Sequence, residues 1–197
     1  MSTKAVIVSA LVTIAAAMPG AAAKLSPNYF TAISSHTGVE IVHLREISAS
    51  GQRFYLNKAT SSYCPQVKNL DCSKYGNATV FAYNSDGTMS MNVAVPGGQQ
   101  VYVASGGALG YTGVHSANVP QDAQRATFNY APQTSDGGVG TLTFDNQGFV
   151  VCPTKDAPVY QVFAWTPKDE AGAFRWDCIG IRFASAKYSG TSSYQYN

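Results

Sequence analysis

Histidine and carboxylate side chains are the first candidates for chemistry in this 197-residue sequence, and both kinds are sparse. The histidines are His36, His43 and His115. His36 and His43 are seven positions apart, an odd spacing, so on one strand they would face opposite sides of a sheet. Only Glu40 and Glu46 lie near enough in sequence to complete a metal site. We therefore expect surface or hydrogen-bonded histidines, with no metal ion and no cofactor.

A catalytic carboxylate pair is the second candidate. Glycoside hydrolases place two carboxyl groups on either side of one bond, and Asp177 with Glu40 or Glu46 could form such a pair, although nothing in their spacing requires it. The sequence contains neither a Gly-x-Ser-x-Gly elbow nor a His-Glu-x-x-His zinc motif. The glycine-rich segment 107–113 lacks the Lys-Ser/Thr ending of a phosphate-binding loop. We therefore expect no catalytic residues and no enzyme activity.

Residues 1–23 have the pattern of a cleavable signal peptide. A short segment with one positive charge, Lys4, precedes an apolar run over residues 5–17, and Pro19-Gly20 and three alanines follow. This run is shorter than the roughly 20 residues that cross a bilayer, and no later segment resembles a membrane span. The sequence predicts an exported protein whose mature chain begins at Lys24.

In an exported protein, the four cysteines predict disulfide bonds. They are Cys64, Cys72, Cys152 and Cys178, and they allow three pairings. We prefer the local pairing, Cys64 with Cys72 and Cys152 with Cys178, for which loop entropy assigns about 2.6 and about 3.6 kcal/mol. Zinc is the rival, but the spacings Cys-x7-Cys and Cys-x25-Cys do not match the short hooks of zinc sites.

Two further features concern carbohydrate. Asn77-Ala78-Thr79 is an N-glycosylation sequon beside a turn signal, so Asn77 is a candidate glycosylation site. Trp165 and Trp176 flank a loop containing proline and glycine, and exposed aromatic rings could stack on sugars. The alternative for both tryptophans is packing in the core or over a disulfide.

Short runs rich in Val, Ile, Thr, Tyr and Phe, separated by Gly and Asn/Asp turn signals, predict the fold. We expect an all-β, disulfide-stabilised protein of about ten short strands, either an antiparallel sandwich or a barrel, with little helix. The runs include a strand over 39–44 and hairpins over 79–95 and 141–152. The domain boundaries expected are a signal peptide over 1–23, one β domain over 24–185 and a flexible polar tail over 186–197.

Charge excludes two classes of partner. Charged residues make up 12% of the chain and the net charge is +2. Nucleic-acid binding proteins carry clustered Lys and Arg, and anionic membrane surfaces attract polybasic segments. We therefore expect neither a nucleic acid nor a membrane surface as a partner, and the sequence predicts no particular oligomeric state.

The order of several short motifs resembles the PhiA family of fungal secreted cell wall proteins, whose members are also known as IgE-binding proteins. The motifs are Asn28-Tyr29-Phe30, Leu56-Asn57 before Cys64, Leu109-Gly110-Tyr111-Thr112, Gln147-Gly148-Phe149, Val151-Cys152-Pro153, Trp165 and Asp177-Cys178-Ile179-Gly180-Ile181. The resemblance implies an ascomycete origin and a secreted or wall-associated location. It carries over Cys64, Cys152 and Cys178 and no catalytic residue. The chain departs from the family in its Tyr- and Ser-bearing tail and in a longer segment between Cys64 and Cys72.

Together these features predict a secreted, cell-wall-associated, non-enzymatic protein of a filamentous fungus with a structural, developmental or surface-interaction role. One alternative is a carbohydrate-binding or host-interacting, elicitor-like module. Its partner would be cell wall polysaccharide or a component of a host surface. The second alternative is a glycoside hydrolase with a dispersed carboxylate pair.

Overall fold

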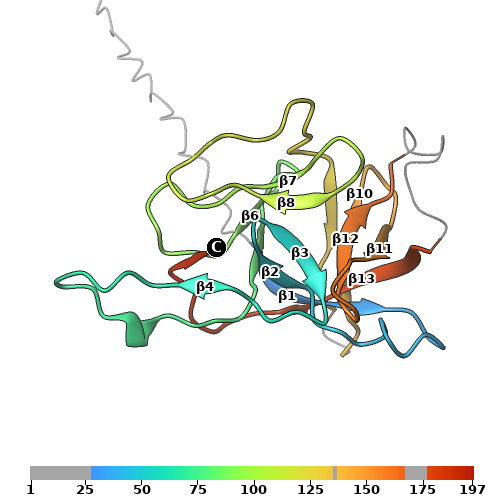
Figure 1. Cartoon of the computed structure of the whole chain (residues 1–197), viewed down its shortest axis with the longest axis horizontal. Helices are drawn as coiled ribbons and strands as arrows, with labels where there is room; N and C mark the ends of the chain where they lie inside the picture. Colours follow the sequence, from blue (N-terminus) through green and yellow to red (C-terminus); the bar gives the residue numbers. More distant parts are fainter. Residues whose placement is uncertain (1–27, 135–136, 167–176) are drawn as a thin grey trace, which may run out of the picture.

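The computed structural model describes residues 28–134, 137–166 and 177–197, and almost all of its regular elements are strands (Figure 1). The predicted signal peptide and the start at Lys24 lie outside the described residues. Within them the only helix is the 3-10 helix η1 (Cys72–Lys74). The strands are β1 (Asn28–Ser35), β2 (Ser48–Ser50), β3 (Arg53–Leu56), β4 (Ser62–Tyr63), β5 (Phe81–Tyr83), β6 (Met89–Met91), β7 (Val101–Val103), β8 (Leu109–Tyr111), β9 (Phe128–Ala131), β10 (Gly140–Phe144), β11 (Phe149–Pro153), β12 (Tyr160–Ala164), β13 (Ile179–Lys187) and β14 (Gln195–Tyr196). The prediction of an all-β fold with little helix is confirmed.

The main sheet is antiparallel and closes on itself. Neighbouring strands follow the order β6-β5-β1-β13-β11-β12-β3-β8-β7. A bridge between Ser90 of β6 and Gln100, which precedes β7, joins the two ends of this path. The sheet is therefore a barrel, one of the two predicted architectures. β14 and β4 form a separate two-stranded sheet beside it.

Aromatic side chains fill the barrel. The pleat of β1 alternates the two faces of the strand, so Phe30 points into the core while the neighbouring Tyr29 is exposed. The Phe81 ring lies at the centre of the cluster, 5.4 Å from the Phe30 ring, 5.1 Å from Phe54 and 5.6 Å from Phe183 between centroids. Such ring pairs add specific contacts to the burial of apolar area.

The long strand β13 pairs with other strands along both of its edges. This pairing differs from one of the predicted hairpins. One edge of β13 pairs with β1, and the other pairs with β10 at Leu142↔Phe183 and with β11 at Phe149↔Ile181. β10 and β11 therefore run in the same direction along one edge of β13, and the predicted hairpin over 141–152 is wrong. The turn signal at Asn146-Gln147-Gly148 marks a bend between two strands that share a partner.

The other predicted hairpin is confirmed. β5 and β6 pair at Phe81↔Met91, and the turn between them contains Gly87 at a φ of +79°. Asp86 Oδ1 accepts hydrogen bonds from the Thr88 backbone N–H at 3.0 Å and from the Thr88 hydroxyl at 2.6 Å. These bonds lower the pKa of the Asp86 carboxyl, the hydroxyl bond contributing most, and they show the turn role expected of aspartate.

The strand predicted over 39–44 is wrong. In the structure this segment is a series of turns, in which the backbone N–H groups of Val42 and His43 both donate to the Val39 carbonyl. Val42 is buried, whereas Ile41 and Leu44 are exposed. Of these three apolar side chains only Val42 is buried, and a tight turn can bury one side chain as well as a strand can. The β-branched residues of this segment therefore do not decide its conformation by themselves.

The polar C-terminal segment also differs from its prediction. β13 continues to Lys187, and Tyr196 of β14 is 1% exposed. The Tyr196 hydroxyl donates to the Ala78 carbonyl at 2.6 Å and accepts from the Val80 N–H at 3.0 Å. The flexible tail expected over 186–197 is therefore corrected to a segment packed on the barrel, because its polar groups find hydrogen-bond partners there.

Candidate functional site

Both disulfides have the preferred local pairing. Cys64 is bonded to Cys72, and Cys152 is bonded to Cys178. The second bond lies beside the paired residues Val151 and Ile179, so it fastens β11 to the start of β13. The first closes a loop outside the barrel.

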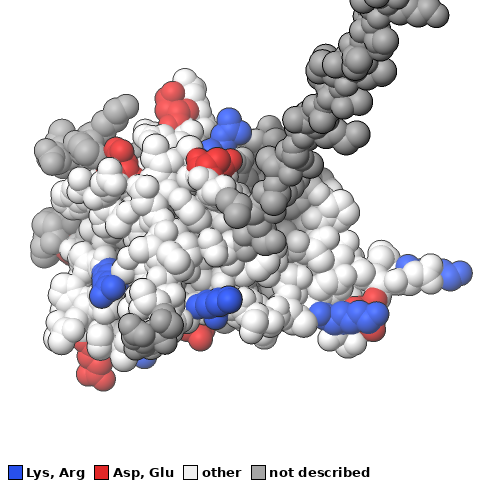
Figure 2. Space-filling view, turned by 180° about the vertical axis from the view of Figure 1, so that it is seen from behind, with Lys and Arg blue, Asp and Glu red and all other residues white. Residues whose placement is uncertain are grey.

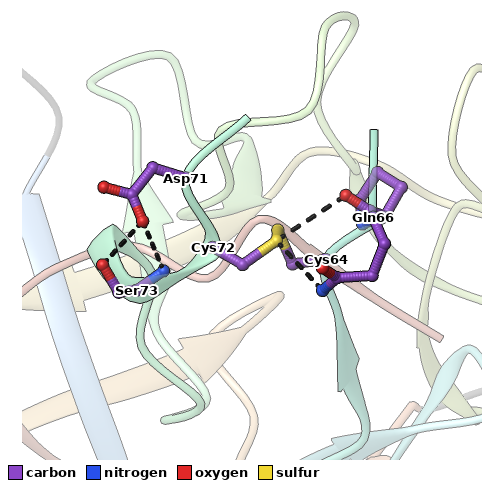
Figure 3. The surroundings of a disulfide bond; sticks show 6 residues. Cys64, Gln66, Asp71, Cys72 and Ser73 are labelled. Atoms are coloured by element: carbon purple, nitrogen blue, oxygen red, sulfur yellow. Dashed lines mark hydrogen bonds between the residues drawn. A yellow bond between two sulfur atoms is a disulfide. The ribbon is translucent and has the colours of Figure 1, made fainter. Parts of the chain in front are cut away.

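That loop belongs to an arm, here residues 62–75, that projects from the barrel (Figure 1). Asp71 caps η1: its Oδ1 accepts from the Ser73 backbone N–H at 3.1 Å and from the Ser73 hydroxyl at 2.6 Å (Figure 3). These bonds, the hydroxyl first, lower the pKa of the Asp71 carboxyl. Gln66 Nε2 lies 3.7 Å from Cys72 Sγ on the other side of the disulfide. The disulfide and the cap thus fix the arm without a buried core of its own.

Exposed and half-buried tyrosines line a hollow of about 360 Å³ beside the ends of β1, β9 and β13. We call it the barrel hollow, and its lining residues are Asn28, Tyr29, Tyr130, Pro132, Gln133, Lys187 and Tyr188. Tyr130 is fixed by stacking on Phe30, with ring centroids 4.4 Å apart and planes at 11°. The sheet thus holds one wall of the hollow rigidly.

Tyr188 is positioned by backbone contacts. Its N–H donates to the Tyr29 carbonyl at 2.9 Å, and its hydroxyl donates to the Thr191 carbonyl at 3.0 Å. A Cβ added at Gly190 would lie 2.5 Å from Tyr188 Oη and 2.6 Å from Cζ. The ring therefore lies against the backbone at Gly190, where only glycine leaves it room.

The barrel hollow has the chemistry of a site for a neutral, hydroxyl-rich ligand. Tyrosine rings offer apolar faces and edges with hydroxyl groups attached. The amides of Asn28 and Gln133 can each donate and accept hydrogen bonds. Lys187 is the only charged side chain among the seven lining residues, and none of them is a carboxylate. The volume of the hollow falls in the range of about 300–1,000 Å³ typical of small-ligand sites.

A second hollow, of about 300 Å³, lies at the base of the arm. We call it the arm-base hollow, and it is lined by Ser62, Tyr63, Cys64, Cys72, Tyr75, Gly76, Asn77 and Tyr194. The Tyr75 and Tyr194 rings meet edge to face at 5.3 Å. A Cβ added at Gly76 would lie 3.8 Å from Tyr188 Oη, so the two hollows are neighbours.

Of the two tryptophans predicted to contact carbohydrate, Trp165 lies within the described residues. Trp165 is half-buried, and its backbone N–H donates to the Gly148 carbonyl at 3.0 Å. Trp176 lies outside the described residues. Their carbohydrate role stays a prediction. Sequence reasoning missed Tyr29, Tyr130 and Tyr188, because they meet only through the register of β1, β9 and β13.

His36 and His43, which would face opposite sides of a sheet on one strand, contact each other in the structure. The His36 backbone N–H donates to His43 Nδ1 at 3.2 Å, and His36 Nδ1 lies 2.5 Å from the Gly180 carbonyl oxygen. The turns over 39–44 bring His43 back toward His36. Across the described residues, no group of three or more His, Cys, Asp or Glu side chains is arranged to hold a metal ion.

Charges are scattered over the molecule. Figure 2 shows a face on which Lys, Arg, Asp and Glu side chains are few and separated by wide uncharged areas. Lys74 and Asp71, both exposed, form an ion pair of 3.8 Å on the arm. No helix among the described residues is long and apolar enough to cross a membrane.

Comparison with known proteins matches this chain to one family over most of its length. Residues 30–197 match the family described as PhiA-like secreted protein. A protein of Arthroderma benhamiae, described as an uncharacterized secreted protein, is 35% identical over 167 residues, which cover 82% of each chain. No solved structure matches. The chain therefore belongs to the PhiA-like secreted protein family of fungi, and it is a secreted protein.

Proposed function

We propose that this secreted protein is a non-enzymatic component of the fungal cell wall that binds a neutral wall polysaccharide in the barrel hollow. The observation that carries the proposal is the meeting of Tyr29, Tyr130 and Tyr188 around one hollow with two amide side chains. Pyranose rings present apolar C–H faces and a rim of hydroxyl groups. Aromatic rings match the first and amides match the second.

The charge of the hollow favours a neutral polymer. An acidic polysaccharide would require several cationic groups, and Lys187 is the only one among the seven described residues that line the hollow. A cationic polymer would require carboxylates, and none of those seven side chains is a carboxylate. Glucan and chitin are uncharged polymers that carry hydroxyl groups. Chitin also carries an amide, with which Asn28 or Gln133 can form hydrogen bonds.

The distribution of carboxylates supports a non-enzymatic role. Hydrolysis of a glycosidic bond uses two carboxyl groups about 5–10 Å apart across a cleft. Of four hollows lined by described residues, one has Glu46 in its lining, another has Glu40, and the two tyrosine hollows have no carboxylate. None of these four linings holds two carboxyl groups, so none of them supports the hydrolase alternative.

A pull-down on insoluble wall polymers tests the proposal. Purified mature protein is mixed with insoluble β-1,3-glucan or with chitin, and the bound fraction is measured for wild type, Tyr29→Ala and Tyr188→Ala. Tyr55→Ala removes a half-buried ring that lines neither tyrosine hollow and is the matched control. We expect both hollow variants to lose binding to one polymer while the control retains it. No binding by the wild-type protein, or equal binding by all variants, would refute the proposal.

The same assay tests the tryptophan hypothesis. Loss of binding in Trp165→Ala together with retention in Tyr188→Ala would move the site from the barrel hollow to the tryptophan loop. A partner on a host surface stays a prediction from the sequence, because no contact among the described residues favours it.

A further inference from the structure

The arm-base hollow is lined by Asn77, a side chain to which a sugar can be attached. Asn77 is exposed and lines the hollow with Tyr63, Tyr75 and Tyr194. It is also the acceptor residue of the sequon Asn77-Ala78-Thr79. A sugar attached to this side chain would therefore begin at the wall of a tyrosine-lined hollow.

Tyr75 and Asn77 line the same hollow on either side of Gly76. The backbone at Tyr75 is extended, with φ −109° and ψ 141°. Gly76 between them lies close to another segment: a Cβ there would be 3.1 Å from both the Thr191 carbonyl oxygen and Oγ1. Glycine thus permits the close packing that holds this segment against residues 191–193.

Hydrogen bonds fix the segment further. The Gly76 N–H donates to the Ser192 carbonyl at 3.0 Å, and the Ser193 hydroxyl donates to the Gly76 carbonyl at 3.0 Å. One residue after Asn77, the Ala78 carbonyl accepts from the Tyr196 hydroxyl at 2.6 Å. Asn77 is therefore presented from a fixed backbone, in contrast to an acceptor on a free loop.

We propose that Asn77 carries an N-linked glycan whose first sugar is seated in the arm-base hollow against Tyr75 and Tyr63, covering the Cys64–Cys72 disulfide. In the attachment step the Asn77 amide nitrogen bonds to C1 of N-acetylglucosamine, one amide proton leaves, and the diphosphate of a lipid-linked donor is the leaving group. Because the sugar is tethered, its contact with the rings is intramolecular, so a weak stacking interaction suffices to seat it.

The sequon threonine sets the order of events. Thr79 is 7% exposed, and its Oγ1 accepts from the Ala49 N–H at 2.8 Å and bonds with Thr60 Oγ1 at 2.7 Å. Its hydroxyl is thus buried in the folded protein, so the glycan is added before this segment folds. For the same reason Asn77→Gln, at an exposed side chain, is a cleaner way to remove the glycan than Thr79→Ala.

The test compares three forms of the protein secreted from a fungal host. One form has the full glycan, one is trimmed by an endoglycosidase to a single N-acetylglucosamine, and one is Asn77→Gln. Mass spectrometry of the Asn77 peptide establishes the occupancy. We expect the first two forms to share a melting temperature and Asn77→Gln to melt about 3 °C lower, as a loss of one such contact implies for a chain of this size.

Two variants show whether the rings cause the difference. In Tyr75→Ala, and independently in Tyr63→Ala, whose exposed ring is not needed for folding, removal of the glycan is expected to leave the melting temperature unchanged. Reduction of Cys64–Cys72 by a soluble phosphine is expected to be slower with the single sugar than without it. An unoccupied Asn77, or an equal effect of the glycan with and without the rings, would overturn the proposal. Neither outcome bears on the barrel hollow, because polysaccharide binding is measured separately.

Discussion

The side-chain amide of Gln99 pairs with the backbone of Tyr196 in the way a neighbouring strand would. Gln99 Nε2 donates to the Tyr196 carbonyl at 2.9 Å, and Gln99 Oε1 accepts from the Tyr196 N–H at 2.8 Å. Nε2 also donates to the Thr112 carbonyl at 3.0 Å, and Gln99 is 1% exposed. One buried side chain thus joins the C-terminal segment to the barrel and brings β14 to the base of the arm.

Replacing Gln99 should therefore cost more stability than its size suggests. Gln99→Ala leaves three buried backbone groups without partners, and we expect a loss of about 3 kcal/mol in the free energy of unfolding. Gln99→Glu keeps the shape, but its carboxylate cannot donate to the two carbonyls, so it should be at least as unfavourable. Urea denaturation measures both. Gln195→Ala removes only an exposed amide contact with Asn197, so it is the control and should change stability by less than about 0.5 kcal/mol. A similar loss in Gln99→Ala and in the control would contradict the role of Gln99.

Alkaline pH should destabilise the fold through two buried tyrosines. Burial raises the pKa of Tyr111 and Tyr196 above their ordinary value. An unfolded tyrosine ionises near pH 10, so above about that pH the unfolded chain releases protons that the folded chain keeps, and stability falls as pH rises. Their contribution is fully present below about pH 10. Melting temperatures from about pH 8 to about pH 11.5 should fall steeply above the ordinary tyrosine pKa in wild type and less steeply in Tyr111→Phe and Tyr196→Phe. A slope unchanged in both variants would contradict this cause.

The contact between Gly140 and Ser185 predicts two opposite effects. A Cβ at Gly140 would collide with Ser185 Oγ and lie 2.7 Å from the Ala131 carbonyl oxygen, so Gly140→Ala should cost about 3 kcal/mol. Ser185 Oγ is buried and has no hydrogen-bond partner among the described residues. Ser185→Ala should therefore raise stability by about 1 kcal/mol. Denaturant titration of both variants checks the signs, and a loss of stability in Ser185→Ala would show that the hydroxyl is stabilising.

The two disulfides should differ in what they stabilise. Loop entropy assigns about 3.6 kcal/mol to Cys152–Cys178 and about 2.6 kcal/mol to Cys64–Cys72. The first fastens two hydrogen-bonded strands of the barrel, and the second closes a loop on the projecting arm. We expect the Cys152→Ala/Cys178→Ala variant to lose global stability and the Cys64→Ala/Cys72→Ala variant to lose less. Hydrogen exchange should locate the second loss in residues 62–75, and a larger global loss from the arm pair would contradict this assignment.

Local patterns in the sequence predicted what depends on near neighbours. The aspartate and glycine of the 79–95 hairpin marked its turn, and the short separation of Cys64 and Cys72 favoured their pairing. These features are set by turn chemistry and loop entropy, both of which act over a few residues.

Long-range pairing decided the rest. β10 and β11 read as a hairpin, but both pair with β13, which is distant in sequence. The C-terminal segment read as a polar tail, because the partners of its polar groups, Gln99 and Ala78, are distant in sequence. The barrel hollow was not predicted for the same reason. Its residues Tyr29, Tyr130 and Tyr188 come from three strand ends that only the closed sheet brings together.

The decisive measurement for the barrel hollow is the dissociation constant for an oligosaccharide of the wall polymer selected by the pull-down. Calorimetry gives this constant for wild type, Tyr188→Ala, Gly190→Ala and the control Tyr55→Ala. Losing one stacking ring should raise the dissociation constant about tenfold, and Gly190→Ala should also weaken binding, because it displaces the Tyr188 ring. We expect weaker binding in these two variants and unchanged binding in Tyr55→Ala. Equal dissociation constants for wild type and Tyr188→Ala would contradict polysaccharide binding in the barrel hollow.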